Sequence, residues 1–200
     1  MKIAVLANDD QWEEIQKSCD CSNMLRINDL ANSPGFIDVY IILNNFTPVT
    51  LGNIDKPVFI NSVTQTLSEL KTPANVVRIN GWNSFLSAKK WEVAGDITHE
   101  MKNVIASLGK QMIVVKDEIG FVSPRIIAMI INEAYFALGE NISTKNEIDI
   151  SMRSGTNYPY GPFEWAIIIG LNNIYKLLEK LASTSKRYIP APLLKHEASL

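Results

Sequence analysis

Residues 155–164 read GTNYPYGPFE, and this turn-rich stretch decides how the second half of the chain is interpreted. Its glycines and prolines predict a turn, and Pro162 stands where the first turn of a following helix accepts proline. An apolar helical pattern over 121–138 precedes the stretch, and another over 171–181 follows it. The chain beyond Lys116 is therefore predicted to be all helix, apart from a tail from Tyr188 that its prolines predict to be extended.

The first half of the chain alternates short apolar runs with turns and helical segments. Asp10, with Glu13 three residues later, predicts the cap of a helix over 11–18, and 97–108 has the spacing of an amphipathic helix. The apolar runs predict strands at 2–7, 24–27, 39–43, 57–60, 76–79, 91–94 and 112–115. This alternation predicts a mainly parallel α/β sheet, with a domain boundary between residues 116 and 117.

Composition excludes several classes of function. The 200 residues are 46% hydrophobic with a net charge of −2, so no basic stripe favours nucleic acid. The apolar runs are too short to cross a membrane, and the first run lacks a signal-peptide cleavage pattern. Cys19 and Cys21 are too close for an unstrained disulfide, and His99 and His196 are the only histidines. We therefore expect free thiols, no metal site and a cytoplasmic protein.

Several segments, in order, resemble the C-terminal domain of the 3-hydroxyacyl-CoA dehydrogenase family. Residues 116–125 (KDEIGFVSPR) resemble its opening junction, 147–149 and 155–164 its Gly-Pro-Phe motif, and 187–194 (RYIPAPLL) its closing segment. The first half resembles the family more weakly, through strand order and residues 91–93. The resemblance implies a shortened Rossmann-like domain over 1–116 and a helical domain over 117–200. In that family these domains serve an NAD-dependent oxidoreductase of fatty-acid metabolism, and the helical domain forms a homodimer.

The resemblance also implies where a cofactor loop would lie. Family members follow the first strand with Gly-x-Gly-x-x-Gly, whose bare backbone approaches the pyrophosphate closely. Aligning residues 2–6 with that strand places Ala7, Asp9 and Trp12 at the three glycine positions. Bulk and a carboxylate there predict that no NAD binds. Asp29, near the position of the ribose-binding acid, is interpreted as a turn residue. The short loop before residue 39 indicates that part of the nucleotide-binding half is deleted.

The family's catalytic positions are also changed. Alignment on residues 91–93 matches Glu92 to the glutamate that orients the catalytic histidine, and it places Asn80 at the histidine itself. Gln65 falls at the serine position and Pro124 at the asparagine of the junction motif. Asparagine cannot accept and return a proton near neutral pH as imidazole does. Only Glu92 therefore keeps the family residue, and the catalytic residues of this chain stay unassigned.

Three functions remain as alternatives. The first is a family protein without NAD-dependent dehydrogenase activity, in effect a pseudoenzyme. It would bind a small acyl or acidic ligand in a pocket that includes Asn80, Asn83 and Glu92, or it would bind a protein partner. The second is an active dehydrogenase with atypical residues, and the third is a non-catalytic dimeric scaffold. We prefer the first, because the helical half is retained while the cofactor half is altered, and we expect a homodimer through the helical domain.

Overall fold

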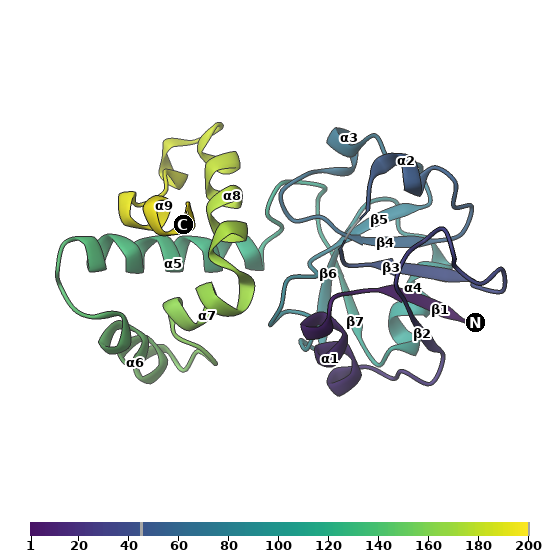
Figure 1. Ribbon diagram of the computed structural model, residues 1–200, viewed down its shortest axis with the longest axis horizontal. Helices are drawn as coiled ribbons and strands as arrows, with labels where there is room; N and C mark the ends of the chain where they lie inside the picture. Colours follow the sequence, from purple (N-terminus) through teal and green to yellow (C-terminus); the bar gives the residue numbers. More distant parts are fainter. Residues whose placement is uncertain (45, 200) are drawn as a thin grey trace. The chain divides into compact units, whose positions relative to one another are not determined.

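The computed structural model describes residues 1–44 and 46–199, which form two compact units, Met1–Phe121 and Val122–Leu200 (Figure 1). Unit 1 combines a sheet with helices and unit 2 is helical, as the sequence predicts. The boundary lies after Phe121 instead of after Lys116. The difference has a physical cause, because the segment that follows Lys116 is bonded to unit 1 by Arg78.

Unit 1 is built on a seven-stranded sheet with the order β2-β1-β3-β4-β5-β6-β7 (Figure 1). Neighbouring strands are parallel except for β5 and β6, which are antiparallel. The chain runs from β1 outward to β2 and then crosses back to β3 on the other side of β1. The strands are β1 (Ile3–Leu6), β2 (Met24–Ile27), β3 (Val39–Ile42), β4 (Val58–Asn61), β5 (Val76–Ile79), β6 (Lys90–Ala94) and β7 (Gln111–Val114).

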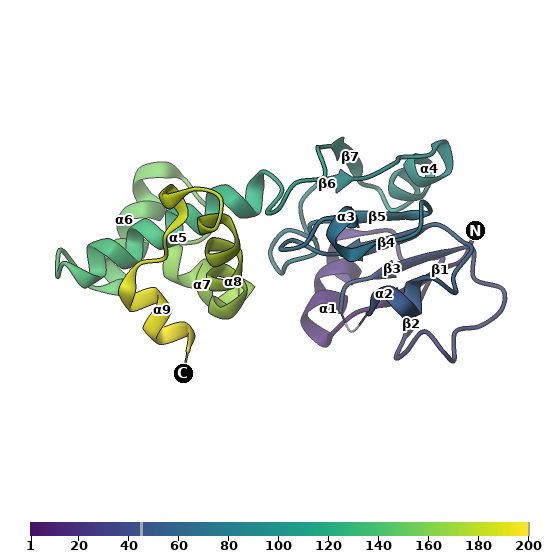
Figure 2. The same cartoon turned by 90° about the horizontal axis from the view of Figure 1, so that it is seen from above.

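Helices cover both faces of the sheet, which explains why its central strands are continuously apolar. Ile3 and Val5 of β1 face a core closed by α1 (Asp9–Ser18) and α4 (His99–Ser107). Ala4 and Leu6 face the opposite core, which is closed by the short helices α2 (Pro48–Leu51) and α3 (Leu67–Leu70). Seen from above in Figure 2, α2 and α3 lie over the strands. The sequence did not predict these two helices, each of which begins with a threonine capping box.

The cap of α1 differs from the prediction. Asn8, not Asp10, is the N-cap residue, and its side chain accepts a hydrogen bond from the backbone N–H of Gln11. The Gln11 side chain in turn accepts from the backbone N–H of Asn8, so the reciprocal capping box is Asn8 with Gln11. Because β1 already ends at Leu6, the helix starts earlier than the apolar spacing indicates.

Unit 2 consists of helices packed around α5. Its helices are α5 (Ser123–Gly139), α6 (Lys145–Thr156), α7 (Pro162–Ile169), α8 (Leu171–Ala182), η1 (Lys186–Tyr188) and α9 (Pro192–Ala198). The expectation of an extended tail is wrong, because Pro192 begins a helix. The segment that precedes α9 is held by buried Asn132 of α5. The Asn132 side chain donates to the Ile189 carbonyl (3.0 Å) and accepts from Ala191 N–H (2.8 Å). No helix among the described residues is long and apolar enough to cross a bilayer.

Candidate functional site

The strand order identifies one place in unit 1 where a ligand is expected. Beyond the carboxyl ends of β1 and β3, the chain turns to opposite sides of the sheet, and α/β proteins bind ligands in the crevice at such a switch point. Leu6 and Ile42 are paired at this end of the sheet. The residues that follow them decide whether a crevice is open.

Side chains of the chain itself occupy this switch point. Gln11 is 5% exposed, and its amide nitrogen donates to the carbonyls of Leu43 (3.4 Å) and Gly81 (3.1 Å). Asn61, at the end of β4, donates to the same Leu43 carbonyl (3.1 Å) and accepts from Gly81 N–H (3.0 Å). A Cβ at Gly81 would lie 2.8 Å from both Asn61 Cβ and Leu43 Cδ2. Gln11 and Asn61 therefore close the space between α1 and residues 43 and 81.

The positions aligned with the three family glycines surround this closed region. Ala7 is buried, Trp12 is half-buried, and the Asp9 side chain is 93% exposed in the first turn of α1. Arg26 donates to the Ala7 carbonyl (3.1 Å) and to Asp9 Oδ1 (2.6 Å), and its guanidinium lies 6.0 Å from the Trp12 ring centroid. With the Asn8 cap and the acidic pair Asp9 and Asp10, the amino end of α1 is already supplied with acceptors.

A second set of bonds holds the loop after β5 against α1. Glu14 of α1 accepts from the backbone N–H groups of Ser84 (2.9 Å) and Ser87 (2.6 Å). Lys110 donates to the carbonyls of Leu86 (2.9 Å), Ser87 and Ala88, and burial lowers the pKa of its ammonium group. Residues 84–88 are thus fixed from two sides, which keeps the loop close to α1.

The structure brings together two of the three candidate pocket residues. Asn80 N–H donates to the Glu92 carbonyl (3.3 Å), so Asn80, which directly follows β5, is a neighbour of Glu92 in β6, and both residues are buried. The Asn80 side-chain oxygen accepts from Trp82 N–H at 3.4 Å. Asn83 is half-buried in the following turn. Asn80 and Glu92 are therefore adjacent buried polar residues, called the polar pair below, and Asn83 follows three residues after Asn80.

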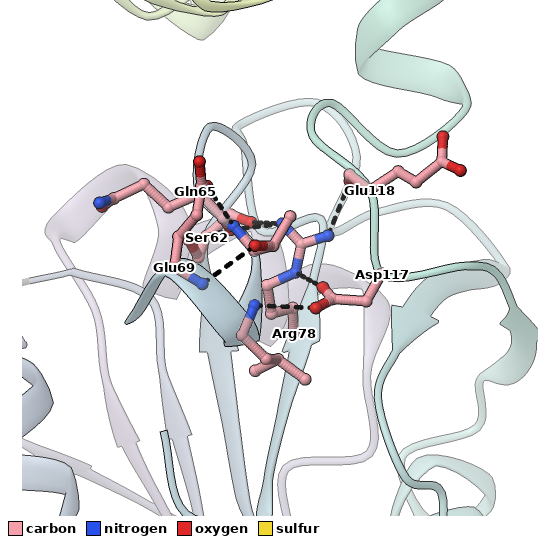
Figure 3. A network of polar contacts seen from close by, with 8 residues as sticks. Ser62, Gln65, Glu69, Arg78, Asp117 and Glu118 are labelled. Carbon is pink, nitrogen blue, oxygen red and sulfur yellow. Dashed lines mark hydrogen bonds and ion pairs between the residues drawn. The ribbon is translucent and has the colours of Figure 1, made fainter. Parts of the chain in front are cut away.

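Gln65, the residue at the serine position, belongs instead to a network around Arg78 (Figure 3). Arg78 is fully buried in β5 and donates to the carbonyls of Gln65, Ser62 (2.9 Å) and Glu118 (2.8 Å). Its Nε lies 2.7 Å from Asp117 Oδ1, and burial lowers the pKa of the guanidinium while Asp117 opposes that shift. The network joins the loop after β4 to the junction segment and explains the later domain boundary.

The remaining predicted position, Pro124, lies in unit 2 at the first turn of α5, where it is buried. Also in unit 2, Asp149 of α6 accepts from the N–H groups of Phe163 (2.8 Å) and Glu164 (3.2 Å). Asp149 therefore caps α7 from another helix, and burial raises its carboxyl pKa. The motif residues of the helical half thus serve packing and capping.

The residues that matter most at the switch point were not identified from the sequence. Gln11 and Asn61 act on carbonyls and N–H groups distant in the chain, so no local pattern reveals them. The one available signal is the spacing of Asn8 and Gln11, which fits a capping box. Within residues 1–44 and 46–199, no group of three or more His, Cys, Asp or Glu side chains is arranged to hold a metal.

Comparison with known proteins gives a family-model match that spans unit 2. Residues 120–199 match the family model of the C-terminal domain of 3-hydroxyacyl-CoA dehydrogenase. The chain is 42% identical over 94 residues to a 3-hydroxyadipyl-CoA dehydrogenase of Escherichia coli K12, covering 46% of this chain and 20% of that protein. It is 30% identical over 141 residues to a 3-hydroxybutyryl-CoA dehydrogenase of Clostridioides difficile, covering 66% of this chain and 50% of that protein. The chain thus spans half or less of the length of these curated relatives.

Solved structures resemble both units. The crystal structure of (S)-3-hydroxybutyryl-CoA dehydrogenase PaaH1 from Ralstonia eutropha superposes with a TM-score of 0.70 at 23% identity, covering 89% of this chain and 70% of that one. The crystal structure of 3-hydroxybutyryl-CoA dehydrogenase from Escherichia coli K12 gives a TM-score of 0.61 at 31% identity, covering 74% of this chain and 32% of that one. The first likeness, at its low identity, concerns the fold alone.

Proposed function

Because the chain belongs to the 3-hydroxyacyl-CoA dehydrogenase family, we propose that it is a member that binds no NAD and has lost dehydrogenase activity. The observation that carries the proposal is the amide of Gln11, which bonds the carbonyls of Leu43 and Gly81 at the switch point of the sheet. The NAD site of the family and these side chains compete for the same place.

Binding a dinucleotide at this place would have a high energetic cost. Displacing Gln11 leaves the buried carbonyl of Gly81 without its donor, and an unpaired buried polar group costs roughly 1–3 kcal/mol. The pyrophosphate would also approach the carboxylates of Asp9 and Asp10 at the amino end of α1. Both carboxylates are exposed and Asp9 is paired with Arg26, so this repulsion is screened to about 1 kcal/mol at a separation of about 4 Å. Together these terms, roughly 2–4 kcal/mol, would weaken an ordinary micromolar affinity of about 8 kcal/mol by about 30-fold to 1,000-fold.

The chemistry of the catalytic position supports the same conclusion. Asn80 lies beside Glu92 where the family histidine is expected, and an amide does not exchange protons near neutral pH. His99 and His196 lie in α4 and α9 and are both exposed. The side-chain amide of Asn80 can still donate a hydrogen bond to a carbonyl or carboxylate of a ligand, and we propose that a small acyl or acidic molecule binds there.

Titration with the coenzyme tests the proposal directly. We expect isothermal calorimetry with NAD⁺ and with NADH to give no saturable heat at micromolar concentrations, because Gln11 and Asn61 fill the site. We also expect no oxidation of NADH with acetoacetyl-CoA above the rate of an Asn80→Ala variant. Micromolar binding of either coenzyme, or turnover that Asn80→Ala abolishes, would contradict the proposal.

The second candidate function is an active 3-hydroxyacyl-CoA dehydrogenase of fatty-acid metabolism with atypical residues. Its support is the 42% identity over 94 residues with a relative that carries such a name. In this candidate either the atypical residues of unit 1 support the reaction or a separately encoded domain binds the cofactor, and the match covers 20% of the relative's length. The same NADH assay, run with and without cell extract that supplies other chains, distinguishes it from the first.

The third candidate, a dimeric scaffold, draws support from apolar side chains on unit 2. Ile142 and Ile167 are 69% and 82% exposed, and we propose that they belong to one contiguous apolar surface, because such surfaces mark interaction sites. We propose a homodimer formed through unit 2, whether or not a ligand is also bound. The proposal places the protein in the cytoplasm, where Cys19 and Cys21, both free in the structure, stay reduced.

Light scattering checks the dimer. We expect the chain of 22.4 kDa to run at twice that mass at micromolar concentration, and Ile167→Glu to lower the dimer fraction by placing a charge in the apolar surface. Val49→Glu is the matched control, because Val49 is 80% exposed on α2 of unit 1. A monomeric wild type, or an equal effect of the two substitutions, would refute the interface on unit 2.

A further inference from the structure

Unit 2 has a cavity of about 290 Å³ between α5 and the short helix η1. Its floor is apolar, because Ile126, Met129 and Ile130 follow one another along a single face of α5. Ligand sites for drug-sized molecules start at roughly 300 Å³, so the occupant of this cavity is a small molecule. Because the floor is apolar, we expect that molecule to carry an apolar group.

Two arginines stand at the cavity beside a tyrosine ring. The guanidinium carbons of Arg187 and Arg125 lie 5.6 and 5.9 Å from the centroid of the Tyr188 ring. A guanidinium that stacks on a ring keeps its planar N–H fork at the edge, where it matches a carboxylate or phosphate. Arg187 is exposed, and within the described residues no carboxylate lies within ion-pair distance of it. The cavity therefore combines an apolar floor with a cationic edge.

We propose that this cavity binds a small organic anion that carries a short apolar chain. The anionic group meets Arg187 and Arg125, and the chain lies on Ile126, Met129 and Ile130. This combination distinguishes the site from the polar pair Asn80 and Glu92 in unit 1. It also stands independently of the loss of NAD binding, because the residues involved all belong to unit 2.

Glu133 limits the affinity of the site and sharpens its test. It lies on α5 two turns after Arg125, and it lines the same cavity. A bound anion is repelled by this carboxylate while it is attracted by the arginines. Neutralising Glu133 should therefore raise the affinity for an anion, and neutralising an arginine should lower it.

Calorimetric titrations of the full chain can test separately whether the ligand needs its negative charge and its apolar chain. The three ligands are hexanoate, hexanol and acetate. We expect saturable binding of hexanoate at millimolar concentration and much weaker binding of hexanol, which lacks the charge, and of acetate, which lacks the chain. Arg187→Gln should weaken hexanoate binding about fivefold or more, because it removes a charged hydrogen-bond donor. Glu133→Gln should strengthen it about twofold. Lys186→Gln, at an exposed neighbour of Arg187 that does not line the cavity, is the matched control.

Several results would overturn the proposal. Absence of hexanoate binding to the wild type would do so, as would equal binding of hexanol. An equal loss in Lys186→Gln and Arg187→Gln would show attraction by surface charge alone. Weaker binding in Glu133→Gln would show that the anion does not sit at this cavity. A failure here leaves the NAD titration of unit 1 unaffected, so the two proposals are judged separately.

Discussion

Replacing Arg78 with methionine is expected to lower the free energy of unfolding of unit 1 by about 3–5 kcal/mol, the usual cost of removing one partner of a buried ion pair. Three backbone carbonyls lose their donor, and the Asp117 carboxylate keeps its charge without a cationic partner (Figure 3). Methionine fills a similar volume, so the loss of unfolding free energy comes from the broken polar network and not from a cavity. Asp117 is 27% exposed, so water offsets part of the cost and the lower end of the range is favoured.

Amide hydrogen exchange separates the two units in this measurement. We expect protection to fall across β4, β5 and residues 117–121, while α8 in unit 2 keeps its wild-type rates. Lys17→Met is the control, because the ion pair of Lys17 with Glu13 joins two exposed side chains and contributes at most about 1 kcal/mol. Wild-type stability of Arg78→Met, or an equal increase of exchange in both units, would show that the network does not hold unit 1 together.

Neutralising the partner tests whether the ion pair or the carbonyl bonds dominate. In Arg78→Met combined with Asp117→Asn, no unpaired charge remains, so part of the stability should return. The backbone N–H of Leu67 donates to the Asp117 carboxylate at 3.0 Å, and the side-chain oxygen that Asp117→Asn leaves in place can still accept this bond. If the double variant recovered the full wild-type stability, the whole loss in Arg78→Met would be due to the unpaired charge of Asp117.

The fold was predictable from local patterns because burial on both faces makes parallel strands continuously apolar. Val39–Ile42 and Val76–Ile79 were found in this way, as was the helical half. Arg78 shows the limit, since a charged residue within such a run gives no indication that it is fully buried. Its burial depends on the carbonyls of Ser62 and Glu118, which only the folded sheet brings together.

Only part of the candidate site could be predicted from the sequence. Ala7, Asp9 and Trp12 could be aligned with the three family glycines because a family pattern assigns a role to each position, and this alignment stays a prediction. The closure of the crevice was not, because Gln11 reaches residues 43 and 81 across the fold. The binding role of Asn80, Asn83 and Glu92 stays a prediction, which the neighbouring positions of Asn80 and Glu92 make testable.

Replacing Gly161 with alanine is expected to cost unit 2 about 2–4 kcal/mol, although the backbone there suits any residue at φ −74°. The difficulty is space, because an added Cβ would lie 2.3–2.4 Å from Oδ1, Cβ and Cγ of Asp149. Asp149 must move, and the first-turn N–H groups of Phe163 and Glu164 then lose their acceptor. Urea unfolding, with hydrogen exchange at α7 as the local readout, measures the loss.

Gly155→Ala is the matched control within the same turn-rich stretch. Nothing lies within 4 Å of a Cβ at Gly155, which is in the last turn of α6. Alanine there should stabilise unit 2 by up to about 1 kcal/mol, because glycine loses more backbone entropy on folding. Stabilisation by both substitutions would show that the contact with Asp149 is not tight.

A double-mutant cycle decides whether the clash acts through the cap. Asp149→Ala removes both hydrogen bonds to α7 and should itself cost about 2 kcal/mol. Once Asp149 is alanine, the carboxylate no longer obstructs a methyl group at residue 161, so adding Gly161→Ala should cost much less than it does alone. If the two losses instead add in full, Gly161 serves a purpose other than making room for Asp149. The presence of glycine at residue 161 would then have to be explained by the conformation of the turn and not by the cap of α7.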